Sequence, residues 1–313
     1  MAKLAQKDFI SIHDLSFDEI DGIFRLTEDL KDKQRRGEKH EYLWAKSLAM
    51  IFEKPSTRTR VSFEIGMWQL GGLAINLDQE AIGLGVRESV GDVARTLSRY
   101  ADAILVRTFE HEKVLELAKN SSVPVINGLS DLLHPCQALA DIFTVREKKE
   151  GQLKGLKIAY IGDGNNVCHS LMLACAKLGI NLTVACPKGY EPDQLIVDWA
   201  FADAKKTGVE MNILHDPVIA AKDADVIYTD VWASMGQEKE SAKRKKVFRK
   251  FQVNQGLIEL AKDDVIVLHC LPAHRGDEIT DEVLDGTNSV VFDQAENRLH
   301  VQKAILTMLL GGV

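Results

Sequence analysis

The chain reads Ser47-Leu-Ala-Met-Ile-Phe52-Glu-Lys-Pro-Ser56-Thr-Arg-Thr-Arg60 in its first quarter. The run up to Phe52 is almost entirely apolar, which is typical of a strand buried on both faces. Lys54-Pro55-Ser56 predicts a turn, and a helix should begin near Thr57. A buried strand that turns directly into a helix is a repeating unit of a parallel α/β sheet.

The following helix carries Val61, Ile65 and Trp68 at i, i+4 and i+7, which predicts one apolar face. Working outward, short apolar runs alternate with helical stretches along the whole chain. Strands are expected over 73–77, 103–106, 123–127, 157–161, 181–186, 210–213, 226–230, 265–270 and 290–292. Helices are expected over 16–36, 90–100, 112–119, 134–149, 166–178, 195–206 and 296–310. The alternation predicts an α/β protein with parallel sheets, and 151–155 is a candidate linker between two halves.

The composition is that of a folded protein with a large core. The chain has 313 residues, of which 45% are hydrophobic, and this length suggests two domains. A net charge of −7 argues against a general nucleic-acid binder, so an anionic substrate would need a locally basic site. The first residues lack the apolar core of a signal peptide, and no apolar run reaches the roughly 20 residues of a membrane helix. We therefore expect a soluble, cytoplasmic protein.

The cysteines indicate neither a disulfide framework nor a zinc site. Their number is odd and none forms a CxxC pair. Reduced thiols in the cytosol are the simplest interpretation. The five are Cys136, Cys168, Cys175, Cys186 and Cys270.

The turn before the helix at Thr57 predicts a phosphate site. Free N–H groups and the dipole at a helix N-terminus favour an anion. The hydroxyls of Ser56, Thr57 and Thr59 add donors, and Arg58 adds a bidentate guanidinium. The alternative is an ordinary Ser/Thr helix cap followed by a solvated arginine.

A second polar pair opens the helix expected from His134. Gln137 follows at i+3, so both side chains can point at one spot. Together they supply the donors and acceptors that suit a planar amide or carbonyl. The alternative is a structural histidine with a glutamine on the helix face.

Asp230-Val-Trp-Ala-Ser-Met-Gly236 follows a strand, where open α/β sheets bind ligands. Asp230 could hold an ammonium group with Ser234 beside it, and Gly236 would let the loop move. The charged stretch 237–250 is interpreted as a solvated helix face rather than a nucleic-acid patch, because it is short and contains acidic residues.

The segment His269-Cys-Leu-Pro-Ala-His-Arg-Gly276 also follows a buried strand. Adjacent His269 and Cys270 raise the hypothesis of a nucleophile. A metal site is a second hypothesis, because five of the nine histidines and all the cysteines lie in the second half or near its border. The sequence has no HExxH, paired CxxC or GxSxG motif to support either one, so both are disfavoured.

Ile161-Gly-Asp-Gly-Asn-Asn166 raises a dinucleotide-binding alternative, since a GxG lies between a strand and a helix. Val167 occupies the place of the third glycine, and the next strand ends at Cys186-Pro-Lys188 without an acidic residue for the ribose. The glycines are better explained by a tight turn that leaves Asn166 facing a cleft.

These segments, in this order, resemble the aspartate/ornithine carbamoyltransferase family over essentially the whole chain. Ser56–Thr59 and His134–Gln137 resemble motifs shared by the family. Asp230–Gly236 and His269–Pro272 resemble its ornithine branch, as do the segments 162–166 and 295–298. The resemblance implies transfer of a carbamoyl group from carbamoyl phosphate to the δ-amine of L-ornithine. The products would be L-citrulline and phosphate, in arginine biosynthesis, without a cofactor or a metal.

The resemblance also implies roles for single residues. It assigns carbamoyl phosphate to Ser56, Thr57, Arg58, Thr59, Arg107, His134, Gln137, Cys270, Leu271 and Arg298. It assigns ornithine to Asn166, Asp230, Ser234 and Met235. Catalytic roles fall to Arg107, His134, Asp230 and Cys270. Neither Cys270 nor Asp230 is singled out as the proton acceptor, and an oxygen of the phosphate is an equal alternative.

The fold implied by the resemblance is two Rossmann-like αβ domains with the active site in the cleft between them. Residues 1–150 would bind carbamoyl phosphate, with the last helix, 296–313, packed back on them. Residues 151–295 would bind ornithine. The family forms homotrimers, so a homotrimer or a multiple of trimers is expected. Many bacterial relatives place a glutamine from a neighbouring subunit where this chain has Gly83, and Arg87 is a candidate replacement.

Overall fold

The computed structural model describes residues 3–78, 82–234, 236 and 238–311. It divides into two compact units, unit 1 (Met1–Leu139 with Glu296–Val313) and unit 2 (Ala140–Ala295). The boundaries fall inside two helices, α6 (Pro135–Lys148) and α13 (Val291–Leu310). None of the helices in the described part of the chain is long and apolar enough to cross a membrane.

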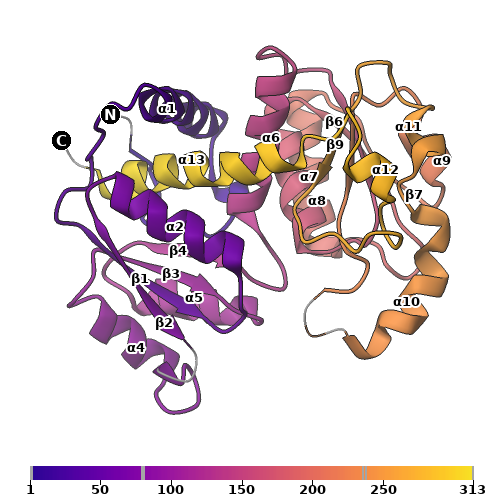
Figure 1. The fold of residues 1–313 in the computed structure, drawn as a ribbon. Helices are drawn as coiled ribbons and strands as arrows, with labels where there is room; N and C mark the ends of the chain where they lie inside the picture. The colour runs from indigo at the N-terminus through magenta and orange to yellow at the C-terminus, as the bar shows by residue number, and fades with distance from the viewer. Residues whose placement is uncertain (1–2, 79–81, 235, 237, 312–313) are drawn as a thin grey trace. The chain divides into compact units, whose positions relative to one another are not determined.

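Unit 1 has a four-stranded parallel sheet in the order β2-β1-β3-β4. Its strands are β1 (Ser47–Phe52), β2 (Leu73–Asp78), β3 (Ala103–Arg107) and β4 (Val125–Leu129). Its helices are η1 (Ile12–Asp14), α1 (Phe17–Arg35), α2 (Thr57–Gln69), α4 (Val90–Leu97) and α5 (His111–Asn120). Figure 1 shows α2 on one face of this sheet and α4 on the other.

Local sequence explains where the helices of unit 1 begin. Helix α1 starts with a capping box, because the Ser16 hydroxyl accepts from the Glu19 N–H and the Glu19 carboxylate accepts from the Ser16 N–H. The strands of the sheet and the helices α4 and α5 share one apolar cluster, which includes Ile51, Val93 and Leu117. This core fixes the carboxyl ends of β1 and β3, where the predicted phosphate site begins.

The apolar face of α2 does not pack into the core. Val61, Ile65 and Trp68 are exposed, with Trp68 at 72% of its full exposure. The residues of α2 that are buried include Phe63 and Met67 instead. The i, i+4, i+7 pattern therefore predicted the helix, but this stripe faces outward.

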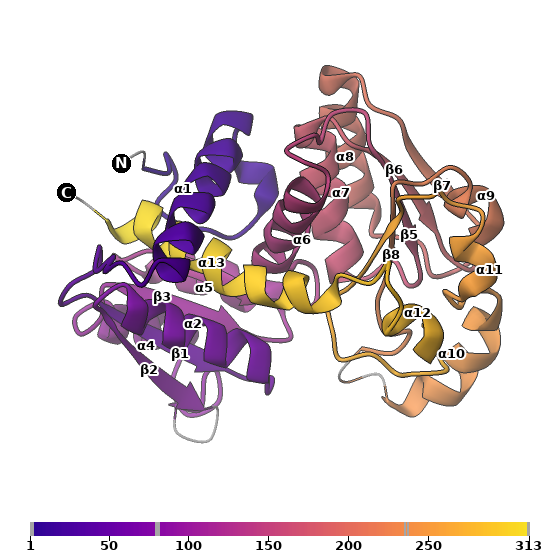
Figure 2. The same cartoon turned by 45° about the horizontal axis from the view of Figure 1, so that its top comes forward.

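Unit 2 has a five-stranded parallel sheet in the order β7-β6-β5-β8-β9. Its strands are β5 (Lys157–Ile161), β6 (Asn181–Ala185), β7 (Met211–Leu214), β8 (Val226–Thr229) and β9 (Ile266–His269). Its helices are α7 (Asn166–Leu178), α8 (Gln194–Thr207), α9 (Pro217–Ala221), η2 (Glu238–Glu240), α10 (Ser241–Phe248), η3 (Arg249–Phe251), α11 (Gln255–Ile258) and α12 (Asp281–Leu284). Figure 2 shows α7 and α8 on one face of this sheet and α9 and α11 on the other.

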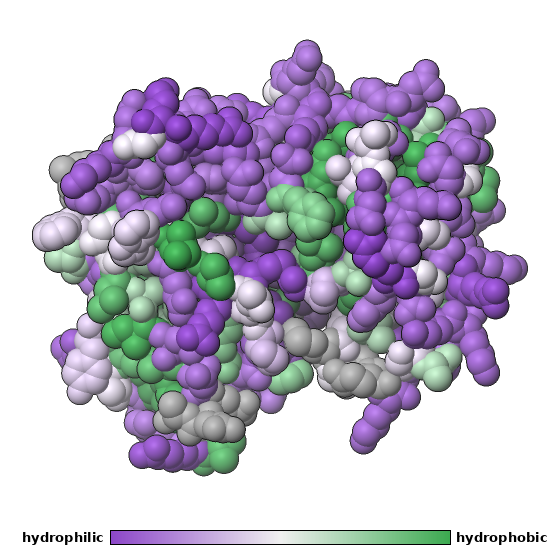
Figure 3. Space-filling model, in the orientation of Figure 1, coloured by the Kyte–Doolittle hydropathy of each residue, from purple (hydrophilic) through white to green (hydrophobic). Residues whose placement is uncertain are grey.

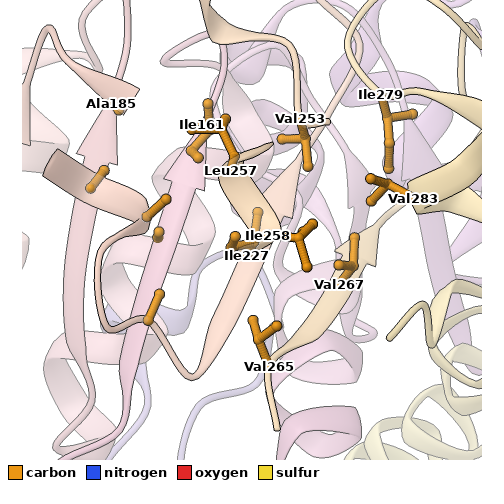
Figure 4. Close-up of a cluster of buried hydrophobic side chains, with 14 of the residues drawn as sticks. Ile161, Ala185, Ile227, Val253, Leu257, Ile258, Val265, Val267, Ile279 and Val283 are labelled. Carbon is orange, nitrogen blue, oxygen red and sulfur yellow. The ribbon is translucent and has the colours of Figure 1, made fainter. Parts of the chain in front are cut away.

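The core of unit 2 on the α9 side is built from small and branched side chains. Figure 4 shows Ile161, Ile227 and Val267 from the strands facing Leu257 of α11 and Val283 of α12. Such packing holds the carboxyl ends of β5, β8 and β9 rigidly, and the segments 162–166, 230–236 and 270–276 all leave from these ends.

Most elements agree with the sequence-based expectations, and the two parallel α/β sheets are confirmed. The prediction of a short strand over 290–292 is wrong. Only an isolated bridge between Val267 and Ser289 forms there, and α13 begins at Val291, five residues earlier than expected. The expectation of a solvated helix over 237–250 is also wrong in part, because Arg244 and Phe248 of α10 are buried.

Candidate active site

Thr59 is the centre of the polar cluster in unit 1. Ser56 caps α2 by accepting from the Thr59 N–H at 3.2 Å. The buried Thr59 hydroxyl lies 2.9 Å from Arg298 Nη2 and 3.4 Å from Arg107 Nη1, and both arginines donate to it. Two buried guanidinium groups thus meet at the N-terminus of one helix, where the backbone already favours an anion.

His134 and Gln137 lie at the start of α6, and both are buried. Burial lowers the pKa of His134 well below its ordinary value of 6.5, and the positive charges of Arg298, Arg107 and Arg58 lower it further. His134 is therefore a neutral imidazole near neutral pH.

The structure brings eight of the predicted residues together in what we call the unit 1 cluster. These are Ser56, Thr57, Arg58, Thr59, Arg107, His134, Gln137 and Arg298. Thr57 is exposed, Ser56 and Arg58 are half-buried, and the other five are buried. Two residues assigned to the same substrate, Cys270 and Leu271, lie instead in unit 2.

Sequence reasoning missed two buried charges beside this cluster. Glu53 joins the ends of β1 and β3: its N–H donates to the Arg107 carbonyl at 2.9 Å, and its carboxylate accepts from the Thr108 hydroxyl and from Lys113 Nζ. Lys54 Nζ lies 4.1 Å from the centre of the Phe109 ring. Burial, followed by the charge of Arg107, lowers the pKa of Lys54. Glu53 and Lys54 directly follow β1, and their place at the carboxyl end of a buried strand is the sequence feature that could have identified them.

Asp230 is the centre of the polar cluster in unit 2. Its Oδ1 accepts from Cys270 Sγ at 3.0 Å and from the Val231 N–H at 2.8 Å. Its Oδ2 accepts from Asn165 Nδ2 at 2.7 Å. Asn165 in turn caps α7, because its Oδ1 accepts from the Val167 N–H. We call Asn165, Asp230 and Cys270 the unit 2 cluster, and it presents a carboxylate held in one orientation.

The other residues predicted for ornithine lie near these strand ends. Asn166 is the first residue of α7, and Ser234 lies four residues beyond Asp230; both are half-buried. Met235 lies outside the described residues. Asn165 was not predicted, although it belongs to the same glycine-containing segment as Asn166.

Arg244 of α10 anchors the segment that follows Asp230. Its Nη1 donates to Asp163 Oδ2 at 2.9 Å and to the Trp232 carbonyl at 2.8 Å. The guanidinium also lies over the Tyr190 ring, 4.9 Å from its centre. Burial raises the pKa of Asp163 to about 6, although the Arg244 charge lowers it. Arg244 therefore holds the backbone at Trp232, two residues before Ser234.

The histidine next to Cys270 does not activate it. His269 Nδ1 accepts from the Leu271 N–H at 2.9 Å, and its Nε2 lies 3.2 Å from Glu278 Oε1. The Cys270 thiol faces Asp230 instead. Ligand atoms of Asp230, His269 and Cys270 lie within 4.8 Å of one another, but both His269 nitrogens already have partners. The geometry therefore favours neither the nucleophile nor the metal hypothesis.

The glycines after β5 are explained by close packing. A Cβ on Gly164 would lie 2.3 Å from the Pro192 nitrogen and 2.4 Å from the Glu191 carbonyl carbon. The Gly164 N–H also donates to the Tyr190 carbonyl. Because the backbone of 190–192 covers this turn, the tight-turn interpretation holds and the dinucleotide alternative loses its phosphate cradle.

The fold is that of an α/β protein, with converging guanidinium groups at a helix N-terminus in unit 1 and a fixed carboxylate at the strand ends of unit 2. Residues 7–147 match the model of the aspartate/ornithine carbamoyltransferase carbamoyl-P binding domain. Residues 154–309 match the model of the Asp/Orn binding domain of the same family. The chain belongs to the aspartate/ornithine carbamoyltransferase family.

Individual relatives agree with this assignment. The chain is 55% identical to the ornithine carbamoyltransferase of Thermococcus kodakarensis, over 100% of this chain and 99% of that protein. It is 55% identical to the anabolic ornithine carbamoyltransferase of Pyrococcus furiosus, with the same coverage. A solved structure of ornithine carbamoyltransferase from Pyrococcus furiosus matches with a TM-score of 0.97, 55% identity and 100% coverage of both chains.

Proposed function

We propose that this chain transfers the carbamoyl group of carbamoyl phosphate to the δ-amine of L-ornithine, giving L-citrulline and phosphate in arginine biosynthesis. The observation that carries the proposal is the unit 1 cluster, in which Arg107 and Arg298 converge on Thr59 at a helix N-terminus. Relatives that are 55% identical over their full length are named ornithine carbamoyltransferases, and one of them is named anabolic.

In this proposal the unit 1 cluster binds carbamoyl phosphate. Arg58 would bind the phosphate as a bidentate donor. The N–H groups and the dipole at the N-terminus of α2 would stabilise its negative charge. Gln137 and the Leu271 carbonyl hold the carbamoyl NH2. Residues 1–150 with the last helix would form the carbamoyl-phosphate domain, and residues 151–295 would form the ornithine domain.

The same cluster stabilises the charge that develops during transfer. The uncharged ornithine amine attacks the carbamoyl carbon, a tetrahedral oxyanion forms, and the bond to the phosphate oxygen then breaks. Arg107, His134 and Thr59 are the proposed donors to that oxyanion. Donors fixed in place before the reaction are effective because no reorganisation is needed as the charge appears. A neutral His134 can still donate one N–H.

The acceptor site is proposed around the unit 2 cluster. Asp230 would hold the ornithine ammonium with Ser234, while Asn166 and Met235 would bind the carboxylate. The Asp230 carboxylate is held in place by its hydrogen-bond partners Asn165, Val231 and Cys270. Cys270 and Asp230 remain candidates to promote loss of the amine proton, alongside an oxygen of the phosphate. No step requires a cofactor or a metal.

The direct test is citrulline formation from carbamoyl phosphate with ornithine, putrescine, N-acetylornithine and aspartate as competing acceptors. Ornithine should be preferred by about 10⁴-fold over putrescine, because putrescine leaves polar groups of the site unpaired. Aspartate should not react. A preference for putrescine or aspartate would overturn the proposal.

The rate should depend on pH through the substrate amine. Between about pH 6 and 9, kcat/KM for ornithine should rise roughly tenfold per unit, because a lysine-like amine has a pKa near 10.4 and only its uncharged form reacts. His134 should not produce this rise, because burial and the neighbouring arginines lower its pKa well below 6.5. A flat profile would exclude amine deprotonation as the controlling event.

We also propose that the chain assembles as a homotrimer or a multiple of trimers. The support is the exposed apolar face of α2 and the neighbouring strand β2, which carries Val61, Ile65, Trp68, Leu73 and Ile75. Figure 3 shows hydrophobic side chains gathered on this part of unit 1. An apolar face of this kind is typical of a surface that another protein chain covers.

Replacing Trp68 by glutamate should weaken this assembly, since a charge would be buried without a partner. Light scattering after size exclusion should report a smaller mass for Trp68→Glu than for the unmodified chain. The control is Val218→Glu, at a residue of unit 2 that is 51% exposed. An unchanged mass for Trp68→Glu would exclude this face from the interface.

A cytoplasmic location is proposed on the state of the thiols. All five cysteines lie in the described part of the chain, and none is joined in a disulfide. Reduced thiols are typical of a reducing compartment.

Arg87 remains a candidate contact to a neighbouring subunit. Its side chain is exposed, and it follows a turn at Gly83, whose φ of 58° favours glycine.

A further inference from the structure

Leu271 has a backbone conformation that its side chain disfavours. Its φ is 57°, in the left-handed region, which is unfavourable for a residue with a bulky side chain. Its N–H donates to His269 Nδ1 at 2.9 Å. This hydrogen bond is therefore one of the contacts that hold Leu271, and with it the direction of the Leu271 carbonyl.

The hydrogen bond from Leu271 also decides the tautomer of His269. Since Nδ1 accepts a hydrogen bond from the Leu271 N–H, it carries no proton, and the imidazole proton is on Nε2. That nitrogen lies 3.2 Å from Glu278 Oε1, so His269 donates to the Glu278 carboxylate. Both side chains are completely buried. Glu278 thus selects the tautomer whose other nitrogen can accept from Leu271.

Glu278 and His269 are themselves held from several sides. Glu278 Oε1 also accepts from the His274 N–H at 2.5 Å, which ties it to the segment after Pro272. The His269 N–H donates to Gln294 Oε1 at 2.9 Å, and Gln294 Nε2 donates to Asp141 Oδ1 at 2.7 Å. The imidazole therefore has little freedom to turn away from Leu271.

We propose that Glu278 and His269 are positioning residues for carbamoyl transfer, which hold the Leu271 carbonyl where the carbamoyl NH2 binds. This inference rests on the proposed function. Neither residue touches substrate: Glu278 fixes the His269 tautomer, and His269 fixes Leu271. Loss of either link should misplace an acceptor in the site, and a displacement of about 1 Å can cost roughly 10²-fold in rate.

A matched pair of variants at His269 tests the link to Leu271. In His269→Asn the amide oxygen can replace Nδ1 and still accept from Leu271. In His269→Gln the amide can replace Nε2 and reach Glu278, but the acceptor for Leu271 is lost. We expect His269→Gln to have about tenfold lower kcat than His269→Asn, with a higher KM for carbamoyl phosphate. Equal kinetics in two variants with the same melting temperature would overturn the proposal.

A second pair at Glu278 tests the other link, including the case in which a His269 variant does not fold. Glu278→Gln keeps an oxygen acceptor for His269 Nε2–H, and Glu278→Met has a similar volume without one. The first should stay within about threefold of the unmodified kcat, and the second should lose about 10–100-fold. If both behave alike, the inference fails. That result would leave the proposed function intact. If the unmodified chain forms no citrulline, the proposed function is wrong, and the inference that rests on it is wrong too.

Discussion

Replacing Arg107 by alanine should lower kcat for citrulline formation by about 10²–10³-fold, which is typical for removing one donor to an oxyanion. Arg107 is buried at the end of β3 and donates to the Thr59 hydroxyl, so a guanidinium is fixed beside the proposed reaction centre. Its proposed work is greatest on the transition state, so kcat should fall more than carbamoyl-phosphate affinity. Steady-state kinetics with each substrate varied in turn measure both quantities.

The control for this variant is Arg95→Ala in α4, which removes an exposed arginine paired with Asp92. Surface ion pairs contribute little, so its kinetics should match those of the unmodified chain. Melting temperatures of both variants separate lost chemistry from lost folding. A higher KM with unchanged kcat in Arg107→Ala would limit Arg107 to binding the ground state.

Asp230→Asn should lower kcat/KM for ornithine by roughly 10²–10³-fold, because a buried charge contact to the ammonium group is worth about 3–4 kcal/mol. The amide keeps an acceptor oxygen but loses the charge. Its NH2 would also face either Asn165 Nδ2 or the Val231 N–H, both of which are donors. Turnover of putrescine, which lacks the α-ammonium and α-carboxylate groups, should change little, so the preference for ornithine should shrink.

Asp198→Asn is the matched control, since Asp198 is an exposed carboxylate on α8 in the same unit. Competition between ornithine and putrescine in one reaction gives the preference directly. If Asp230→Asn lowered both activities equally, Asp230 would act on a step common to both acceptors, and its assignment to the ammonium would be wrong.

Local sequence signals were sufficient wherever a few neighbouring residues decide the structure. The strand β1 and the start of α2 have the expected bounds, because an apolar run and a serine cap act within one or two turns. Thr57 opens α2 where Ser56 predicts it. For the same reason the polar residues at the ends of the parallel strands could be named, since such ends meet at one edge of a sheet.

Structural features that depend on contacts between distant residues could not be predicted from the sequence. The stripe with Trp68 has the period of a core face, and period alone cannot tell core from an exposed surface. The partnership of Asn165 with Asp230 joins positions 65 residues apart. The prediction of a short strand at 290–292 was wrong because an apolar run of that length fits the first turn of a helix equally well.

The return of the last helix to unit 1 has a consequence for how the protein is made. Arg298 donates to Thr59, which lies 239 positions earlier in the chain, and Lys31 Nζ donates to Asn297 Oδ1. Chains emerge from the ribosome with the N-terminus first. A nascent chain would therefore contain the turn and helix around Thr59 long before it contains Arg298. Alleles that stop translation anywhere before codon 298 should consequently lack Arg298, one of the two arginines that converge on Thr59, however much of unit 1 they encode.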